Sequence, residues 1–133
     1  MLPRGYANGR TATQAVAYAL TQVGIWRDSG YCLRFVGRVV YQRPWDGGSI
    51  NEAHMVWDNA PNSLRYERDF DAPRGAIVLW SSAIGGGAGH IAISLGGGKM
   101  VTTTGGAISI RSIRGFSDRA FLGWMPPYFR SRP

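Results

Sequence analysis

The segment from residue 76 to residue 95 reads AIVLWSSAIGGGAGHIAISL, with two short apolar runs on either side of a glycine-rich connection. Short apolar runs bounded by turn residues are typical of strands buried in a sheet. The glycines between the runs favour a turn. The segment therefore predicts two antiparallel strands, with His90 at the start of the second one.

The rest of the chain divides at residue 73, with helical periodicity before it and strand-like runs after it. Capping boxes at residues 11–14 and 49–52 predict two helix starts, while Gly24, Pro44 and Pro61 predict helix ends. We expect helices over residues 12–23, 32–41 and 50–59, and strands over residues 76–80, 91–95, 100–103, 107–113 and 121–124. Helices followed by an antiparallel sheet are the α+β pattern.

The length of 133 residues, with 44% hydrophobic and 12% aromatic residues, supports one domain with one core. We predict a single domain over residues 1–133, in which residues 126–133 begin a linker to a further module. The N-terminus has no apolar run that could act as a signal peptide, and no stretch is long enough to span a bilayer. The thiol of the chain is then expected to stay free in a reducing cytoplasm.

The chain is strongly basic, with a formal net charge of +7, and Lys99 is the only lysine among 15 basic residues. A surface of this kind favours anionic partners such as nucleic acid, acidic lipid or a cell-wall polymer. The arginines are spread along the chain rather than gathered in one run. A solvated basic surface explains this spread equally well, so both interpretations stay open.

Cys32 is the only cysteine, so it has no intramolecular disulfide partner, and two histidines supply a zinc site poorly. It begins the predicted helix over residues 32–41, where the helix N-terminus stabilises a thiolate and a backbone N–H can face an oxyanion. His90 follows a flexible loop and is mounted on a strand, from which its imidazole can take the thiol proton. The alternative is a buried cysteine that packs as a small hydrophobic residue, with a structural histidine elsewhere.

Three segments resemble CHAP domains, and two of them also resemble NlpC/P60 domains. These segments are GYCLRFV at residues 30–36, APRGAIVLW at residues 72–80 and GHIAI at residues 89–93. The resemblance spans about residues 13–124. It implies a papain-like α+β core, with N-terminal helices packed on a small antiparallel β-sheet, and cleavage of amide bonds in peptidoglycan. It also implies that Cys32 is the nucleophile and His90 the general base.

The chain departs from these families at several positions. Leu33 replaces the serine that follows the cysteine in most NlpC/P60 members, which favours CHAP, and Ala76 replaces the usual aspartate of the P-x-G-D motif. The resemblance to NlpC/P60 domains implies that Thr102, on the next strand, orients His90 as the third catalytic residue. Asp118, in a following loop, is the alternative, and the sequence leaves both open.

Aromatic residues close to Cys32 in sequence are candidates for contacts with sugar or stem-peptide atoms. They are Trp26, Tyr31 and Trp45. No cofactor and no metal ligand are predicted, because residues 46–52 lack the alternating ligand spacing of an EF-hand and His54 is expected at the surface. Some CHAP domains bind calcium, so the resemblance leaves calcium open.

These observations predict a peptidoglycan hydrolase with a Cys–His mechanism, as the catalytic domain of a phage endolysin. A bacterial toxin or a tail-associated lysin fits nearly as well, and endopeptidase and N-acetylmuramoyl-L-alanine amidase activities both remain open. We expect peptidoglycan as the partner, no nucleic acid, no membrane insertion and a monomer made in the host cytoplasm that acts on the bacterial cell wall. The alternative is a non-catalytic basic module that binds wall polymer or nucleic acid.

Overall fold

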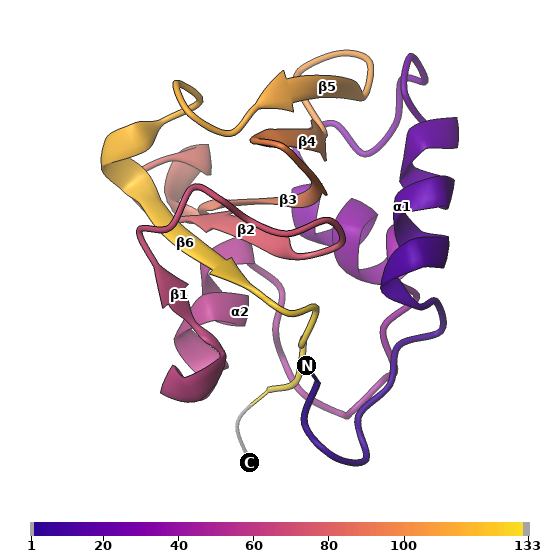
Figure 1. The fold of residues 1–133 in the computed structure, drawn as a ribbon, viewed down its shortest axis with the longest axis vertical. Coiled ribbons are helices and arrows are strands. Elements are labelled where there is room, and N and C mark those ends of the chain that lie inside the picture. The colour runs from indigo at the N-terminus through magenta and orange to yellow at the C-terminus, as the bar shows by residue number, and fades with distance from the viewer. Residues whose placement is uncertain (1, 132–133) are drawn as a thin grey trace.

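The structure is built around one antiparallel sheet of six strands in the order β1-β6-β2-β3-β4-β5 (Figure 1). The computed structural model describes residues 2–131. The strands are β1 (Tyr66–Glu67), β2 (Ile77–Trp80), β3 (His90–Gly96), β4 (Lys99–Thr102), β5 (Ser109–Ser112) and β6 (Phe121–Met125). The five predicted strands are present with small shifts at their ends. The edge strand β1 is too short to leave a pattern in the sequence.

The strands β2 and β3 form the predicted hairpin, in which Trp80 pairs with His90 and Ile77 pairs with Ile93. All four residues of β2 are buried. Their side chains alternate between two apolar clusters, with Ile77 facing the helices and Trp80 facing the opposite side of the sheet. A strand that is buried on both faces reads as a continuous apolar run, which explains the AIVLW segment.

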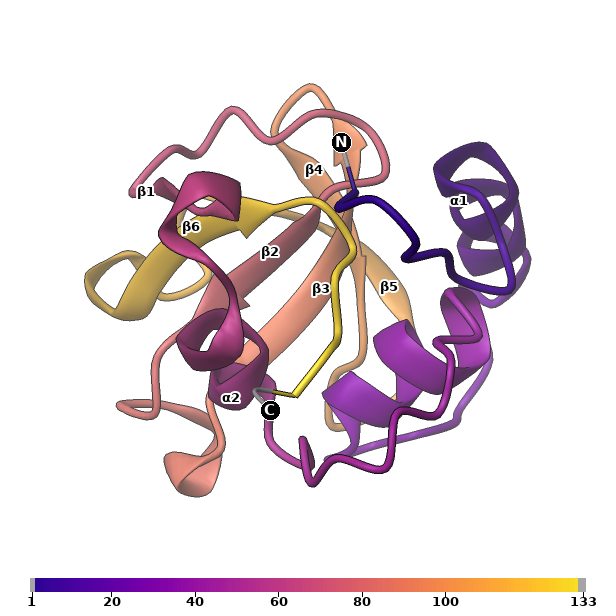
Figure 2. The ribbon, with the colours of Figure 1, turned by 90° about the horizontal axis from the view of Figure 1, so that it is seen from below.

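Three helices pack on one face of the sheet, as Figures 1 and 2 show. They are α1 (Ala12–Thr21), the π-helix η1 (Arg34–Val40) and α2 (Ala53–Asn59). Each of them contacts β3, and their apolar side chains share one core with the sheet. The prediction of N-terminal helices on a small antiparallel sheet is confirmed. Within residues 2–131, no helix has the length and apolar character needed to cross a membrane.

The helix that follows Cys32 is wound as a π-helix, whereas the sequence pattern predicts an ordinary helix there. The Tyr41 N–H donates to the Val36 carbonyl at 3.0 Å, a hydrogen bond between residues five apart. Hydrogen bonds of this spacing define a π-helix, which is rare and occurs mostly as single turns within α-helices. Phe35, Val36, Val40 and Tyr41 are all fully buried, so this segment packs into the core.

The two predicted capping boxes have different outcomes. The Thr11 side chain accepts a hydrogen bond from the Gln14 backbone, and the Gln14 side chain accepts one in return, so the box at α1 is confirmed. The box at residues 49–52 is wrong, because α2 begins after Glu52, whose side chain makes no cap. The His54 N–H instead donates to the Ala88 carbonyl at 3.0 Å. A partner distant in sequence thus satisfies an amide at the start of α2.

Loops cover the opposite face of the sheet and form a second, smaller core. Phe70 stacks on Phe121 with ring centroids 4.2 Å apart, and Phe116 packs against Trp80 at 4.9 Å. These aromatic contacts hold the loop after β5 against the sheet. They matter for function because this loop also reaches His90.

The segment after β6 turns back onto the domain. Phe129 is buried and packs against Tyr41, with ring centroids 6.0 Å apart. The Tyr128 ring contacts Tyr6 edge-on, with ring centroids 4.8 Å apart. The chain is therefore part of the domain as far as Phe129. Residues 132–133 of the predicted linker lie outside the described residues, and the linker stays a prediction.

We predict that Gly123→Ala lowers the free energy of unfolding by about 2–4 kcal/mol. Gly123 lies in β6 with φ 137°, and a Cβ there would overlap the Tyr66 carbonyl oxygen of β1. Gly97→Ala is the matched control, because Gly97 has φ 63° and no heavy atom within 4 Å of a Cβ. Urea denaturation should show a loss of about 1 kcal/mol for the control. Equal losses in both variants would contradict the steric argument.

Candidate active site

Cys32 and His90 line the same cleft, which has a volume of about 530 Å³. Cys32 lies two residues before η1 and packs against the core on the helix side of the sheet. His90 is the first residue of β3. Its ring lies toward the opposite side of the sheet, against Trp80. The cleft therefore forms where the start of β3 meets the start of the helix. Cys32 and His90, which the sequence predicts to act together, both line it.

A hydrogen bond to Thr102 orients the His90 ring. The distance from His90 Nε2 to Thr102 Oγ1 is 2.7 Å. Thr102 Oγ1 also lies 3.1 Å from the Thr103 carbonyl oxygen, and when the hydroxyl donates there its oxygen accepts from the ring. The hydrogen of the neutral imidazole is then on Nε2, which leaves Nδ1 free to accept a proton.

Two aromatic rings enclose His90. Phe116 stacks on it with centroids 4.9 Å apart and planes inclined by 26°, and Trp80 lies at 5.6 Å. Burial in this environment lowers the pKa of His90 to about 4. The imidazole is therefore neutral at physiological pH, the form that a general base requires.

The thiol of Cys32 is also kept in its neutral form. Burial raises its pKa, although backbone N–H groups, with that of Ile91 contributing most, act in the opposite direction. Because burial disfavours the charged forms of both groups, the resting pair is a thiol and a neutral imidazole. A proton must therefore pass from the thiol to the imidazole before or during attack by sulfur.

A buried carboxylate holds the segment before Cys32 in place. Asp28 adopts a left-handed backbone with φ 53°, and its carboxylate accepts hydrogen bonds from Arg27 at 2.8 Å and Arg34 at 2.6 Å. Burial would raise the pKa of Asp28, but hydrogen bonds from the two arginines hold it below its usual range. The Asp28 carbonyl also accepts from the Tyr31 N–H at 2.8 Å. Asp28 thus links the segment before Cys32 to Arg34, the first residue of η1.

The three predicted substrate-contact residues are all exposed, but they differ in their position relative to the cleft. The Trp26 side chain is 76% exposed and lies over Gly106, next to the cleft residue Gly105. Tyr31 is 58% exposed and lies beside Cys32. Trp45 is 78% exposed and lines neither the cleft nor the hollow that adjoins it at Cys32. The structure therefore brings Trp26 and Tyr31 to the site, and Trp45 stays apart from it.

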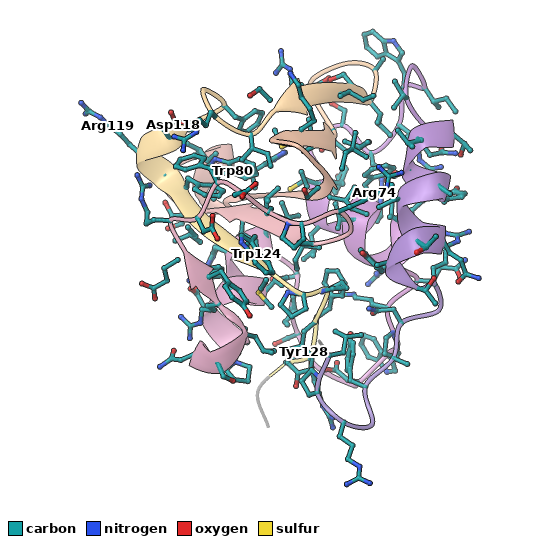
Figure 3. All side chains as sticks on the ribbon, viewed as in Figure 1. Arg74, Trp80, Asp118, Arg119, Trp124 and Tyr128 are labelled. Carbon is teal, nitrogen blue, oxygen red and sulfur yellow. The ribbon has the colours of Figure 1, made fainter. Side chains whose placement is uncertain are left out.

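Asp118, the alternative third residue, is occupied elsewhere. Its carboxylate accepts a hydrogen bond from the Gly115 N–H at 2.7 Å. Figure 3 shows it beside Arg119 at the margin of the molecule. Of the two candidates, only Thr102 is hydrogen-bonded to His90.

The remaining candidates form local contacts. His54 is largely shielded from solvent between Asp58, 2.7 Å from Nδ1, and Glu52, 3.0 Å from Nε2. Hydrogen bonds to these carboxylates, chiefly Asp58, raise the pKa of His54. The oxygens of Asp46 accept from the backbone N–H groups of Gly48 and Ser131, at 2.9 and 2.8 Å. Asp46 therefore stabilises a turn and a contact with the C-terminal segment.

Sequence reasoning missed two residues that shape the site, Phe116 and Asp28. Phe116 lies in a loop without periodicity, and no local signal connects it with His90. Asp28 could have been suspected, because an aspartate between arginines shortly before a nucleophile can form ion pairs. Its left-handed backbone and its burial are properties of the folded chain.

Compared by sequence, the chain matches no protein-family model and no curated protein. Compared by structure, it is similar to the NlpC/p60 domain of the peptidoglycan hydrolase SagA, with a TM-score of 0.56 and 21% identity over 87% of this chain and 98% of that one. It is also similar to the P60 domain of the M. avium subspecies paratuberculosis antigen MAP1204, with a TM-score of 0.47 and 16% identity over 90% and 98% of the two chains. The likeness to the SagA domain confirms the predicted papain-like α+β fold.

We predict that alkylation of Cys32 by iodoacetamide accelerates with pH through about pH 9 and shows no plateau between about pH 5 and 8. Burial raises the pKa of the thiol from its usual value of 9.0, and a pre-formed thiolate–imidazolium pair would produce the plateau. Mass spectrometry of the carbamidomethylated protein measures the rate at each pH. The denatured chain serves as the reference for an unshifted thiol, and a plateau in the folded protein would refute the neutral pair.

Proposed function

We propose that this chain is a peptidoglycan hydrolase domain that cleaves a peptide or amide bond with Cys32 as nucleophile and His90 as base. The observation that carries the proposal is the common cleft of Cys32 and His90, with Thr102 hydrogen-bonded behind the imidazole. The fold of an NlpC/p60 domain from a peptidoglycan hydrolase supports the choice of substrate. The net charge of +7 suits an anionic cell wall.

The neutral resting pair leads to a specific sequence of steps. His90 Nδ1 removes the thiol proton as the Cys32 sulfur attacks the carbonyl carbon, and the backbone N–H of Cys32 stabilises the oxyanion. The imidazolium then donates its proton to the leaving amine, and the C–N bond breaks to leave a thioester. His90 next deprotonates water, which attacks the thioester carbonyl carbon. The C–S bond breaks to release a carboxylic acid, and the imidazolium returns its proton to the Cys32 sulfur. Thr102 keeps Nε2 protonated throughout and so holds Nδ1 toward the reaction.

We further propose that the domain belongs to a phage endolysin made in the host cytoplasm and acting on the bacterial wall. The basic surface, which suits an anionic wall, supports this assignment. The CHAP subfamily, rather than NlpC/P60, is favoured by Leu33 after the nucleophile. The same Cys–His chemistry serves an endopeptidase and an amidase, so mass spectrometry of the released muropeptides is the measurement that identifies the bond.

We predict that Cys32→Ala lowers the rate of wall lysis at least a thousandfold, because the covalent step requires the sulfur. The assay is the turbidity of purified cell walls, with circular dichroism to establish that the variant is folded. Cys32→Ser is the companion variant, since it retains the shape of the side chain but supplies a weaker nucleophile. If folded Cys32→Ala clears walls at the wild-type rate, the chain is a binding module instead.

We predict that Thr102→Val lowers kcat roughly tenfold or more with little change in KM, because the imidazole loses the partner that orients it. The branched apolar side chain preserves the volume of Thr102 and removes only the hydroxyl. Asp118→Asn should leave both constants unchanged, because Asp118 bonds the Gly115 amide rather than His90. The reverse pattern would transfer the orienting role to Asp118.

A further inference from the structure

A second hollow, of about 230 Å³, adjoins the cleft at Cys32, which lines both. Its wall includes three arginines on or just beyond η1, Arg34, Arg38 and Arg43. We call it the arginine hollow. Arg34 forms an ion pair with Asp28 at 2.6 Å.

The structure fixes Arg43 in position. Its side chain lies across Gly37 of η1, where a Cβ would come within 3.2 Å of Arg43 Cδ. Its backbone N–H donates to the Gly37 carbonyl at 2.8 Å, and one guanidinium nitrogen donates to the Ile50 carbonyl at 3.1 Å. A guanidinium has five N–H donors, so this bond leaves others for a ligand.

Within residues 2–131 neither Arg38 nor Arg43 forms an ion pair, although Asp46 acts on Arg43 electrostatically from beyond salt-bridge distance. The carboxylate of Glu52, which also lines the hollow, is directed to His54 at 3.0 Å. That of Asp46 is held by backbone N–H groups. Burial and, second, the positive charge of Arg38 lower the pKa of Arg43, whereas Tyr6 and Asp46 act in the opposite direction.

We propose that the arginine hollow is a carboxylate-binding subsite, in which Arg38 and Arg43 hold a free carboxylate of the peptide substrate beside the scissile bond. Guanidinium groups bind carboxylates with paired, charge-assisted hydrogen bonds. A carboxylate bound in the arginine hollow would lie next to Cys32. It therefore belongs to the peptide that is cleaved rather than to a distant part of the wall. This inference rests on the proposed function, and it names the feature of the stem peptide that the domain selects.

The test measures binding in the Cys32→Ala background, where no cleavage occurs. Two synthetic stem peptides are compared by calorimetry, identical except that the γ-linked glutamate of one has a free α-carboxylate and that of the other a carboxamide. We expect the free carboxylate to bind roughly tenfold more tightly. Arg38→Gln should abolish this preference by weakening only the carboxylate peptide. Arg38 is exposed, so its substitution is compatible with folding.

Arg119→Gln is the matched control. It removes the same charge from an exposed arginine that points away from the body of the molecule (Figure 3), and the preference should persist. The subsite would be overturned if the two peptides bound equally tightly or if neither bound. It would also be overturned if Arg38→Gln lowered the affinity for both peptides equally. A carboxylate preference in a protein that fails to lyse walls would support the subsite and refute the proposed function.

Discussion

The backbone ladder between β2 and β3 is the interaction on which the other parts of the molecule depend. It places Trp80 opposite His90 and gives each strand two buried faces, so the helices and the loops both pack against it. The first residue of β3 lies at the end of this ladder. Because His90 is paired with Trp80 at this end of the ladder, the sheet holds the imidazole in position near the start of η1, where Cys32 lies.

Two environments meet at Cys32. On one side, burial disfavours the charged forms of His90 and Cys32, so both groups rest in neutral forms. On the other side, Arg38 and Arg43 line the arginine hollow, and neither forms an ion pair within residues 2–131. In the proposed subsite, the carboxylate of the substrate supplies the negative charge that pairs with these guanidinium groups.

Elements with strong local signals were predictable, and elements that depend on remote partners were not. The capping box at Thr11 and the apolar run of β2 each reflect physics within a few residues, and both are present. The start of α2 was predicted too early, since its amide is satisfied by Ala88, far along the chain. The π-helical winding of η1 and the short strand β1 likewise depend on packing against other elements rather than on propensity.

For the site, the sequence predicted Cys32 and His90 as a pair chiefly through the resemblance to CHAP and NlpC/P60 domains, and the structure places both residues in one cleft. The sequence could not choose between Thr102 and Asp118, nor find Phe116 stacked on the imidazole or Arg38 beside Arg43. Hydrogen bonds, ring contacts and charge repulsion act over a few ångströms. The partners they join are brought within that range only by the sheet register and the packing of loops, which no local pattern encodes.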